Sequence, residues 1–396
     1  MVKPLDGVTI VALEHYVAGP FGTMLLADFG ADVIRIERPG KGEPMRVPQV
    51  TSKDGQVVPI VYLINNRNKR SLTLDLKSQE GQQILRSLLK KADVLYENLS
   101  PEALKRMGLT FDVLQEINPR LIYMSVSGFG REDLGGGPLT NRPALDFIAQ
   151  AMSGLMNGPN LGKEPVWLGM SLPDLATGLT AALGLVTALR ERDRTGKGQR
   201  LDVSMYDVAV MMNDKGLAFY DTAGREPLAI SELTNQVGIV RAKDGHAAIG
   251  VIDNDTWPKI AELIGRSDLA TDPNCATLKR RAAVHSSLIL PAIEAWTIQH
   301  TREEITRTFL KFGVPAGPVQ NSAEVLGCPH LRQRGMTSRI DTEYGPIATM
   351  GNPIRFAGEP LPMRSPPKLG ENTDDVLREL GYSETAIADL HQRNIV

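Results

Sequence analysis

Apolar residues in the first part of the chain fall into short runs that are separated by stretches of helical periodicity. The run Val8–Leu13 predicts a buried strand, and Ala31–Glu37 predicts a second one. The intervening residues have the spacing of a helix that Gly30 ends. Further strands are predicted over 71–76, 92–97 and 121–126, and further helices over 80–90, 101–107 and 146–152. This alternation predicts an α/β fold with a parallel sheet.

The connection between the first two strands is rich in glycine. Gly19, Pro20 and Gly22 predict a tight turn that opens the helix. The pattern contains G-x-x-G but lacks the full G-x-G-x-x-G of dinucleotide-binding proteins, so it predicts a Rossmann-like sheet and supports NAD only weakly. Arg38 comes directly after the second strand, where a basic residue suits a phosphate. An exposed loop arginine is an equally good interpretation of that position.

Basic residues recur around the third predicted strand and on the short helix at 101–107. A solvated surface is the usual meaning of such a set. Here the residues lie near strand ends of a parallel sheet, where open α/β sheets bind ligands, which favours a phosphate-bearing ligand. The set is Arg67, Lys69, Arg70, Lys77, Lys105 and Arg106.

Residues 169–194, GMSLPDLATGLTAALGLVTALRERDR, predict one long helix with an apolar stripe. Ser171 can cap it, and Pro173 lies in the first turn, where a missing N–H costs nothing. The single acid before the charged last turn is Asp174. Two interpretations stay open. Asp174 completes a capping box with Ser171, or it is a carboxylate nucleophile that the helix N-terminus keeps ionised.

The region after residue 220 has a different pattern of predicted elements. It predicts a turn, an apolar strand and a helix, then a long helical pattern over Ile293–Phe312 and a Pro-Gly hinge. The chain then returns with a strand in NPIRFAGEP, a Pro-rich crossing and a helical end. We therefore predict a large domain formed by residues 1–220 and 326–396, with a smaller α+β domain of residues 221–325 inserted in it.

Composition narrows the class of protein. The 396 residues carry a net charge of −2, which argues against a nucleic-acid-binding protein and makes any phosphate site local. Two cysteines, Cys275 and Cys328, and the absence of a recognisable signal peptide predict a reducing cytoplasm. No C-x-x-C or paired histidine has metal-ligand spacing, so we expect no metal site. No apolar run approaches the length that spans a bilayer, so we expect no membrane association.

Taken together and in order, several segments resemble the class III CoA-transferases, a family that includes formyl-CoA transferase, carnitine-type CoA-transferases and 2-methylacyl-CoA racemases. The resemblance runs nearly from end to end. It is carried by LLADFGADVIRIERPGKGEPMR, NNRNKRSLTLDLKSQEG, ADVLYENLSPEALKRMGL, NPRLIYMSVSGFG, the segment containing Asp174, RTGKGQRLDVSMYDV and LGENTDDVLRELGY.

This resemblance implies a Rossmann-like large domain that binds CoA, a small inserted domain and an interlocked homodimer. It implies that Asp174 is the catalytic aspartate, which carries CoA as an aspartyl thioester between an acyl-CoA and a free carboxylic acid. CoA is then a co-substrate, and no tightly bound cofactor is expected. The positions that match the family's CoA contacts are Arg38, Leu74, Lys77, Asn98, Leu99 and Arg106.

Some positions depart from the family's patterns. Formyl-CoA transferase has a glutamine where this chain has Val17, and its glycine-run loop has no clear counterpart over 234–238, which puts oxalate–formate exchange in doubt. The racemases place a catalytic histidine where this chain has Pro143, which cannot move a proton. A 2-methylacyl-CoA racemase is therefore the disfavoured alternative. An NAD-dependent oxidoreductase and a non-catalytic acyl-CoA binder are the other classes to be distinguished.

The predicted chemistry builds an oxyanion at each acyl-transfer step. Backbone N–H groups of flexible loops are the expected donors to that oxyanion. The candidate loops are residues 128–137 and 235–238.

Overall fold

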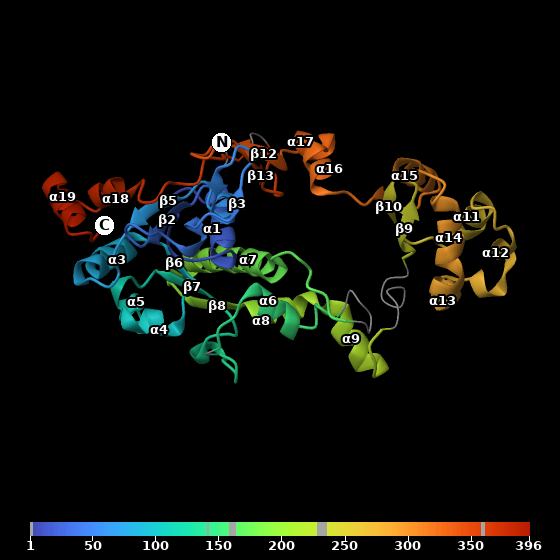
Figure 1. Ribbon diagram of the computed structural model, residues 1–396. Helices are drawn as coiled ribbons and strands as arrows, with labels where there is room; N and C mark the ends of the chain where they lie inside the picture. The colour runs from blue at the N-terminus through green and yellow to red at the C-terminus, as the bar shows by residue number, and fades with distance from the viewer. Residues whose placement is uncertain (1–2, 141, 158–163, 228–235, 358–360) are drawn as a thin grey trace. The chain divides into compact units, whose positions relative to one another are not determined.

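The computed structural model describes residues 3–140, 142–157, 164–227, 236–357 and 361–396, which form two compact units. The first contains the described residues up to Leu155, Trp167–Met212 and Pro329–Val396 (Figure 1). The second contains those of Met156–Val166 and Asn213–Cys328. The sequence-based boundaries lie after residues 220 and 325, whereas the chain changes unit after Met212 and after Cys328, and the described residues of Met156–Val166 also belong to the second unit.

The first unit is built on a six-stranded sheet with the order β5-β2-β1-β6-β7-β8. All five strand pairings are parallel. Numbered along the chain, this order is the 3-2-1-4-5-6 arrangement of Rossmann folds, so the predicted Rossmann-like parallel sheet is confirmed. The strands are β1 (Thr9–Leu13), β2 (Asp32–Glu37), β5 (Arg70–Thr73), β6 (Val94–Glu97), β7 (Ile122–Ser127) and β8 (Arg200–Ser204).

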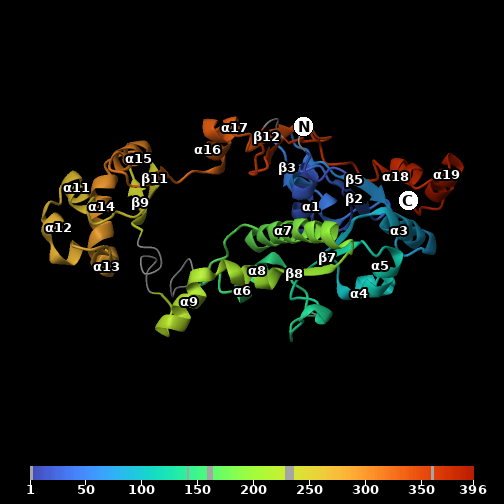
Figure 2. The same ribbon diagram turned by 180° about the vertical axis from the view of Figure 1, so that it is seen from behind.

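Alternate residues of the strands fill two separate cores. Val11 and Leu95 face one core, which α3, α5, α18 and α19 complete, whereas Ile10 and Val94 face the other, which contains α1, α7 and α8. Figure 2 shows α7 on its side of the sheet and α18 beyond β5. The helices are α1 (Ala18–Asp28), α3 (Gln79–Lys91), α5 (Phe111–Ile117), α7 (Leu172–Thr195), α8 (Met205–Met212), α18 (Thr373–Glu379) and α19 (Glu384–Gln392).

Shorter elements complete this unit. The helix predicted over 101–107 is α4 (Pro101–Arg106), and the one predicted over 146–152 is α6 (Asp146–Met152). The strand predicted in NPIRFAGEP is wrong for its described residues, because the chain pairs earlier, in the hairpin of β12 (Thr337–Ile340) and β13 (Ile347–Met350). The remaining elements are β3 (Val50–Thr51), β4 (Val57–Val58), α2 (Ile60–Asn65) and α17 (Pro329–Gln333).

Helices α1 and α7 cross at a pair of glycines. A Cβ atom on Gly178 would lie 2.7 Å from the carbonyl oxygen of Ala18, and one on Gly22 would lie 2.8 Å from the carbonyl oxygen of Gly178. The prediction that Gly19 and Gly22 form a turn before the helix is wrong, since both lie inside α1. They serve close packing of the two helices instead.

Helix α7 corrects one expectation about apolar runs. Its 24 residues are long and apolar enough to cross a membrane by length and composition alone. It packs on α1 and on strands β7 and β8, and core helices pass the same test. The prediction that no apolar run approaches the length that spans a bilayer is therefore wrong for the length and composition of α7.

The second unit has its own sheet and core. An antiparallel sheet of order β11-β10-β9 packs with the helices around the buried Trp257 and Phe309. The long helical pattern predicted over Ile293–Phe312 is two helices, because Thr301 starts a new helix with a capping box. The elements are α9 (Asp214–Ala223), β9 (Gly238–Ala242), β10 (Gly245–Ile249), α11 (Trp257–Leu263), α12 (Asp268–Thr271), α13 (Leu278–Ala283), α14 (Leu290–Thr297), α15 (Arg302–Lys311), β11 (Ala316–Pro318) and α16 (Ser322–Gly327).

Candidate active site

The carboxyl ends of the parallel strands form the edge at which the candidate residues gather. Strand β1 lies between β2 and β6, and the chain builds the sheet outward from it in both directions. The strand order therefore reverses between β1 and β6, and open α/β sheets bind ligands in the crevice at such a point. Arg38 follows β2, and Asn98 follows β6, so the sequence-predicted positions flank this crevice.

Asp174 reaches the same edge on α7. The helix ends at Thr195 and leads directly into β8, so its last turn lies at the amino ends of the strands and its first turn at their carboxyl ends. Gly178, one turn beyond Asp174, lies against Ala18 in the first turn of α1. The first turns of α7 and α1 thus lie near each other at this edge of the sheet.

A second aspartate, which the sequence did not single out as functional, holds the start of α7. The backbone N–H of Asp174 donates to Oδ1 of Asp146, at the start of α6, over 3.1 Å. Ser171 makes no side-chain capping bond, so the capping-box interpretation of Ser171 and Asp174 is wrong. Gln150 donates to the other oxygen of Asp146 and to the carbonyl of Met170, over 2.9 Å in the second case. The cap comes from another helix.

Burial and the neighbouring Asp146 carboxylate both act on the pKa of Asp174. Burial, with the nearby Asp146 charge second, raises the pKa of Asp174 from 3.8 to about 7. Burial also raises the pKa of Asp146. Burial and a second acid thus oppose the helix dipole, which was expected to keep Asp174 ionised.

The residues predicted to contact CoA differ in exposure. Arg38, Lys77 and Arg106 are exposed, so their side chains are available to a ligand. Leu74 is buried in the core, and its N–H donates to the carbonyl of Glu37, so neither its side chain nor its N–H is available to a ligand. Of these four residues, only Arg38, Lys77 and Arg106 therefore offer an exposed side chain to a ligand.

Leu99 and its neighbour Glu97 belong to a buried polar cluster. Arg131 donates to both carboxylate oxygens of Glu97, at 2.8 and 3.1 Å, and to the carbonyl of Leu99 at 2.9 Å. Tyr123 donates a further bond to Glu97. Burial raises the pKa of Glu97 to about 7 against the lowering effect of Arg131. This cluster fixes the backbone of Leu99 at the carboxyl end of β6.

Three of the basic residues that favoured a phosphate ligand are already paired. Arg67 binds both oxygens of Asp28, at 2.8 and 2.6 Å, inside the fold. Arg70 pairs with Asp32 and Glu379. Lys69 is fully buried and donates to Glu14 over 2.7 Å. We correct the expectation that these side chains bind phosphate, because each neutralises an acid of the fold.

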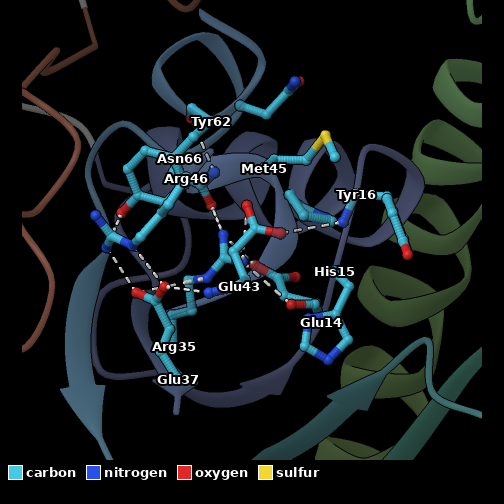
Figure 3. Close-up of polar contacts among 12 residues, drawn as sticks. Glu14, His15, Tyr16, Arg35, Glu37, Glu43, Met45, Arg46, Tyr62 and Asn66 are labelled. Carbon is cyan, nitrogen blue, oxygen red and sulfur yellow. Dashed lines mark hydrogen bonds and ion pairs between the residues drawn. The ribbon is translucent and has the colours of Figure 1, made fainter. Parts of the chain in front are cut away.

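Lys69 and Arg35 belong to a buried charge network at the ends of β1 and β2. Figure 3 shows Arg35 with Glu14, Glu37 and Glu43. Arg35 lies 3.4 Å from Glu43 and 3.9 Å from Glu14 and Glu37. Burial lowers the pKa of Lys69 to about 8. Arg46 binds both oxygens of Glu37, at 2.6 and 2.7 Å. The network joins the chain after β1 to the loop after β2.

Several N–H groups of the loops predicted to stabilise the oxyanion already have hydrogen-bond partners. In the loop 128–137, the N–H groups of Gly130 and Gly137 donate to Ser127 and Thr140, so these two donors are already used. In the second loop, 235–238, only residue 235 lies outside the described residues, and the N–H of Val237 donates to the carbonyl of Gly250, so this donor is used as well. Among the residues that the structure describes, no group of three or more His, Cys, Asp or Glu side chains is placed to hold a metal ion.

Comparison with known proteins gives the class. The model of the family described as CoA-transferase family III matches residues 5–373. Two relatives named formyl-CoA:oxalate CoA-transferase are 34% identical (Rhodopseudomonas palustris strain CGA009, 99% of this chain and 97% of the relative) and 35% identical (Afipia carboxidovorans, 98% and 97%). The chain belongs to CoA-transferase family III and is an enzyme of that family.

Solved structures agree with this family. A CAIB/BAIF family protein from Brucella suis superposes with a TM-score of 0.82 at 32% identity, covering 96% of this chain and 100% of its own. The protein Rv3272 from Mycobacterium tuberculosis gives the same TM-score at 29% identity, covering 94% and 98%. The predicted family is confirmed, and the mixed α/β fold with its parallel sheet is the fold of these neighbours.

Proposed function

We propose that this chain moves CoA from an acyl-CoA thioester to a free carboxylic acid and that Asp174 carries the CoA. The observation that supports this most is the placement of Asp174. Its carboxyl group lies at the first turn of α7, at the edge of the sheet where the strand order reverses, and burial raises its pKa to about 7. A partly desolvated carboxylate is a stronger nucleophile than one in water.

The proposed reaction proceeds through two kinds of intermediate. The ionised Asp174 attacks the carbonyl carbon of the donor thioester, the C–S bond breaks, and a mixed anhydride and CoA thiolate form. The thiolate attacks the aspartyl carbonyl, the C–O bond of the anhydride breaks, and the donor acid leaves. The acceptor carboxylate then attacks the aspartyl thioester, and the released thiolate attacks the acceptor's carbonyl. Asp174 is regenerated, and no net proton or electron is consumed.

Asp146 supports the nucleophile in this proposal. It accepts the N–H of Asp174 and so fixes the backbone from which the carboxyl group extends. After burial, its charge is the second cause that raises the pKa of Asp174 to about 7. Because the nucleophile must be ionised, the reaction should need a pH near or above 7. Pro143 occupies the position of the racemases' catalytic histidine, so we do not favour a 2-methylacyl-CoA racemase.

The CoA co-substrate is proposed to lie along the carboxyl ends of β2, β5 and β6. Arg38 and Arg106 are exposed there and suit its phosphates, and Lys77 lies just beyond β5. Leu74 and Leu99 can contribute backbone groups. With a thiol co-substrate and the free thiols Cys275 and Cys328, we place the enzyme in the cytoplasm.

We also propose a homodimer, interlocked as the family resemblance implies. Helix α7 exposes Leu179, Leu183 and Val186 at 51%, 70% and 42%, and these residues follow one another along one helix face. An apolar face of this kind needs a partner. Sedimentation at nanomolar concentration should give a dimer that does not dissociate, whereas a reversible monomer would contradict interlocking.

The experiment that tests the proposed function is capture of CoA on the chain. Incubation with acyl-CoA should attach CoA to the peptide that contains Asp174, and Asp174→Asn should abolish both attachment and transfer. Transfer without attachment would exclude the covalent mechanism.

A further inference from the structure

The chain that follows β1 is held almost entirely by side chains from other elements. The carbonyl of Glu14 accepts from Arg35 over 3.1 Å, and the N–H of Tyr16 donates to Glu43 over 3.4 Å (Figure 3). Between them, both backbone groups of His15 bind Asn98. Its Oδ1 accepts from the His15 N–H at 2.8 Å, and its Nδ2 donates to the His15 carbonyl at 2.8 Å.

Asn98 makes these bonds across the point where the strand order reverses. His15 lies two residues beyond the end of β1, and Asn98 follows the last residue of β6, its neighbour in the sheet. The carboxamide therefore ties the two strand ends together at the crevice itself. A Cβ atom on Gly19 would lie 3.2 Å from Cγ of Asn98, so the first turn of α1 rests directly on this amide.

The two bonds between the Asn98 carboxamide and the His15 backbone form a clamp. Tyr16, the residue that follows His15, has a strained backbone. Tyr16 has φ of +64°, the left-handed region. The other non-glycine residues with positive φ in the described chain are Asn68 and Asn394, and asparagine tolerates this conformation far better than tyrosine. Burial does not force the strain, since the Tyr16 side chain is 48% exposed. The bonds to His15 and to the Tyr16 N–H hold it.

We propose that Asn98 is a positioning residue that holds the strained turn His15–Val17 and thereby places the start of α1 beside Asp174. The route is continuous: Asn98 fixes His15 and supports Gly19, and Ala18 contacts Gly178 one turn beyond Asp174. This role differs from a direct contact with CoA, because the clamp occupies the carboxamide oxygen and one of its N–H bonds. The inference rests on the proposed function of Asp174.

Tyr16 offers a test that separates the clamp from a ligand contact. Glycine adopts the left-handed conformation without a steric cost, so Tyr16→Gly lets the turn persist without Asn98. Tyr16→Ala removes the same ring but keeps a Cβ atom, which makes it the matched control. We expect Asn98→Ala to slow attachment of CoA to Asp174 about tenfold, and Tyr16→Gly in the same chain to restore most of that rate, whereas Tyr16→Ala restores little.

Three further readouts decide the outcome. Hydrogen exchange at the His15 amide should be faster in Asn98→Ala, whereas Asn98→Asp, which keeps the acceptor of that N–H and loses only the donor to the His15 carbonyl, should retain most of the protection. An unchanged exchange rate in Asn98→Ala overturns the clamp. An equal loss of rate with and without Tyr16→Gly, together with weaker CoA binding by calorimetry, assigns Asn98 to direct CoA contact and also overturns it. If Asn98→Ala changes the unfolding midpoint but not the rate of CoA attachment, the proposal is also overturned, because Asn98 then stabilises the fold without positioning the site.

The exchange measurement keeps the two proposals separable. If wild-type protein attaches no CoA, the proposed function of Asp174 fails, yet exchange at His15 still reports whether Asn98 holds the turn.

Discussion

The backbone N–H of Asp174 donates to a carboxylate oxygen of Asp146 over 3.1 Å, and this bond links the first turns of α7 and α6. An N–H at the third position of a helix is normally satisfied by the residue at its own N-cap. Here Ser171 makes no such bond, and an acid from a neighbouring helix takes its place. The arrangement sets a second carboxylate beside the proposed nucleophile.

Removing the Asp146 charge should shift the pH dependence of the reaction. Asp146→Asn keeps an oxygen that can accept the Asp174 N–H but removes the charge that raises the pKa of Asp174. The acid limb of the pH profile for CoA attachment should therefore move to lower pH. Asp146→Ala should move it in the same direction and also lose about 0.5–2 kcal/mol of stability with the capping bond. An acid limb that stays in place would show that Asp174 does not control it.

Ionisation of Asp174 should destabilise the folded protein. An unfolded aspartate has a pKa of 3.8, against about 7 for Asp174 in the fold. Between these values the native state holds a proton that the unfolded chain has released, so this group lowers the free energy of unfolding as pH rises. The stability advantage of Asp174→Asn over wild type should grow between about pH 4 and pH 7 and level off above. Urea unfolding at fixed protein concentration measures the difference in free energy of unfolding between Asp174→Asn and wild type. A difference that does not change with pH contradicts the raised pKa of Asp174.

The glycines at the crossing of α1 and α7 give a paired prediction. Gly178→Ala should cost about 1–3 kcal/mol, because the new Cβ atom would meet the Ala18 carbonyl at 2.7 Å. Gly184→Ala, in the same helix, is the control. Its Cβ would meet its nearest neighbour at 3.5 Å, so better helix propensity should raise stability by about 0.5–1 kcal/mol. Equal effects of the two changes in chemical denaturation would argue against the close crossing.

The exposed arginines should affect CoA binding more than turnover. Arg38→Ala or Arg106→Ala should weaken CoA binding by about 1.5–3 kcal/mol, the strength of a charged hydrogen bond, with kcat at saturation less affected. Arg190→Ala is the control, since Arg190 is equally exposed but lies near the end of α7, at the opposite edge of the sheet. Calorimetry with CoA measures the effect. Lost turnover at unchanged CoA affinity refutes the assignment.

The sheet and the position of Asp174 could be predicted from the sequence because local patterns determine them. Buried strands are short apolar runs, and Pro173 marks the start of α7, although the capping bond expected of Ser171 does not form. Helix α5 was missed, because its seven residues show too little periodicity.

The environment of the site could not be predicted, since it depends on contacts between residues far apart in the chain. Nothing near Asp174 in the sequence indicates that Asp146, 28 positions earlier, accepts its N–H. The burial of Lys69 depends in the same way on Glu14, 55 positions away, so the local charge run was interpreted as favouring a phosphate-bearing ligand. A strained residue such as Tyr16 has no sequence signal beyond its place after a strand.

The mass of the protein after incubation with acyl-CoA shows whether Asp174 carries CoA. We expect a gain of one CoA per chain, its release by hydroxylamine, and a hydroxylamine mark on the peptide that contains Asp174. Asp174→Asn should fold, bind CoA and gain no mass. A mark on another acid, such as Asp146, or full transfer activity in Asp174→Asn would contradict the account.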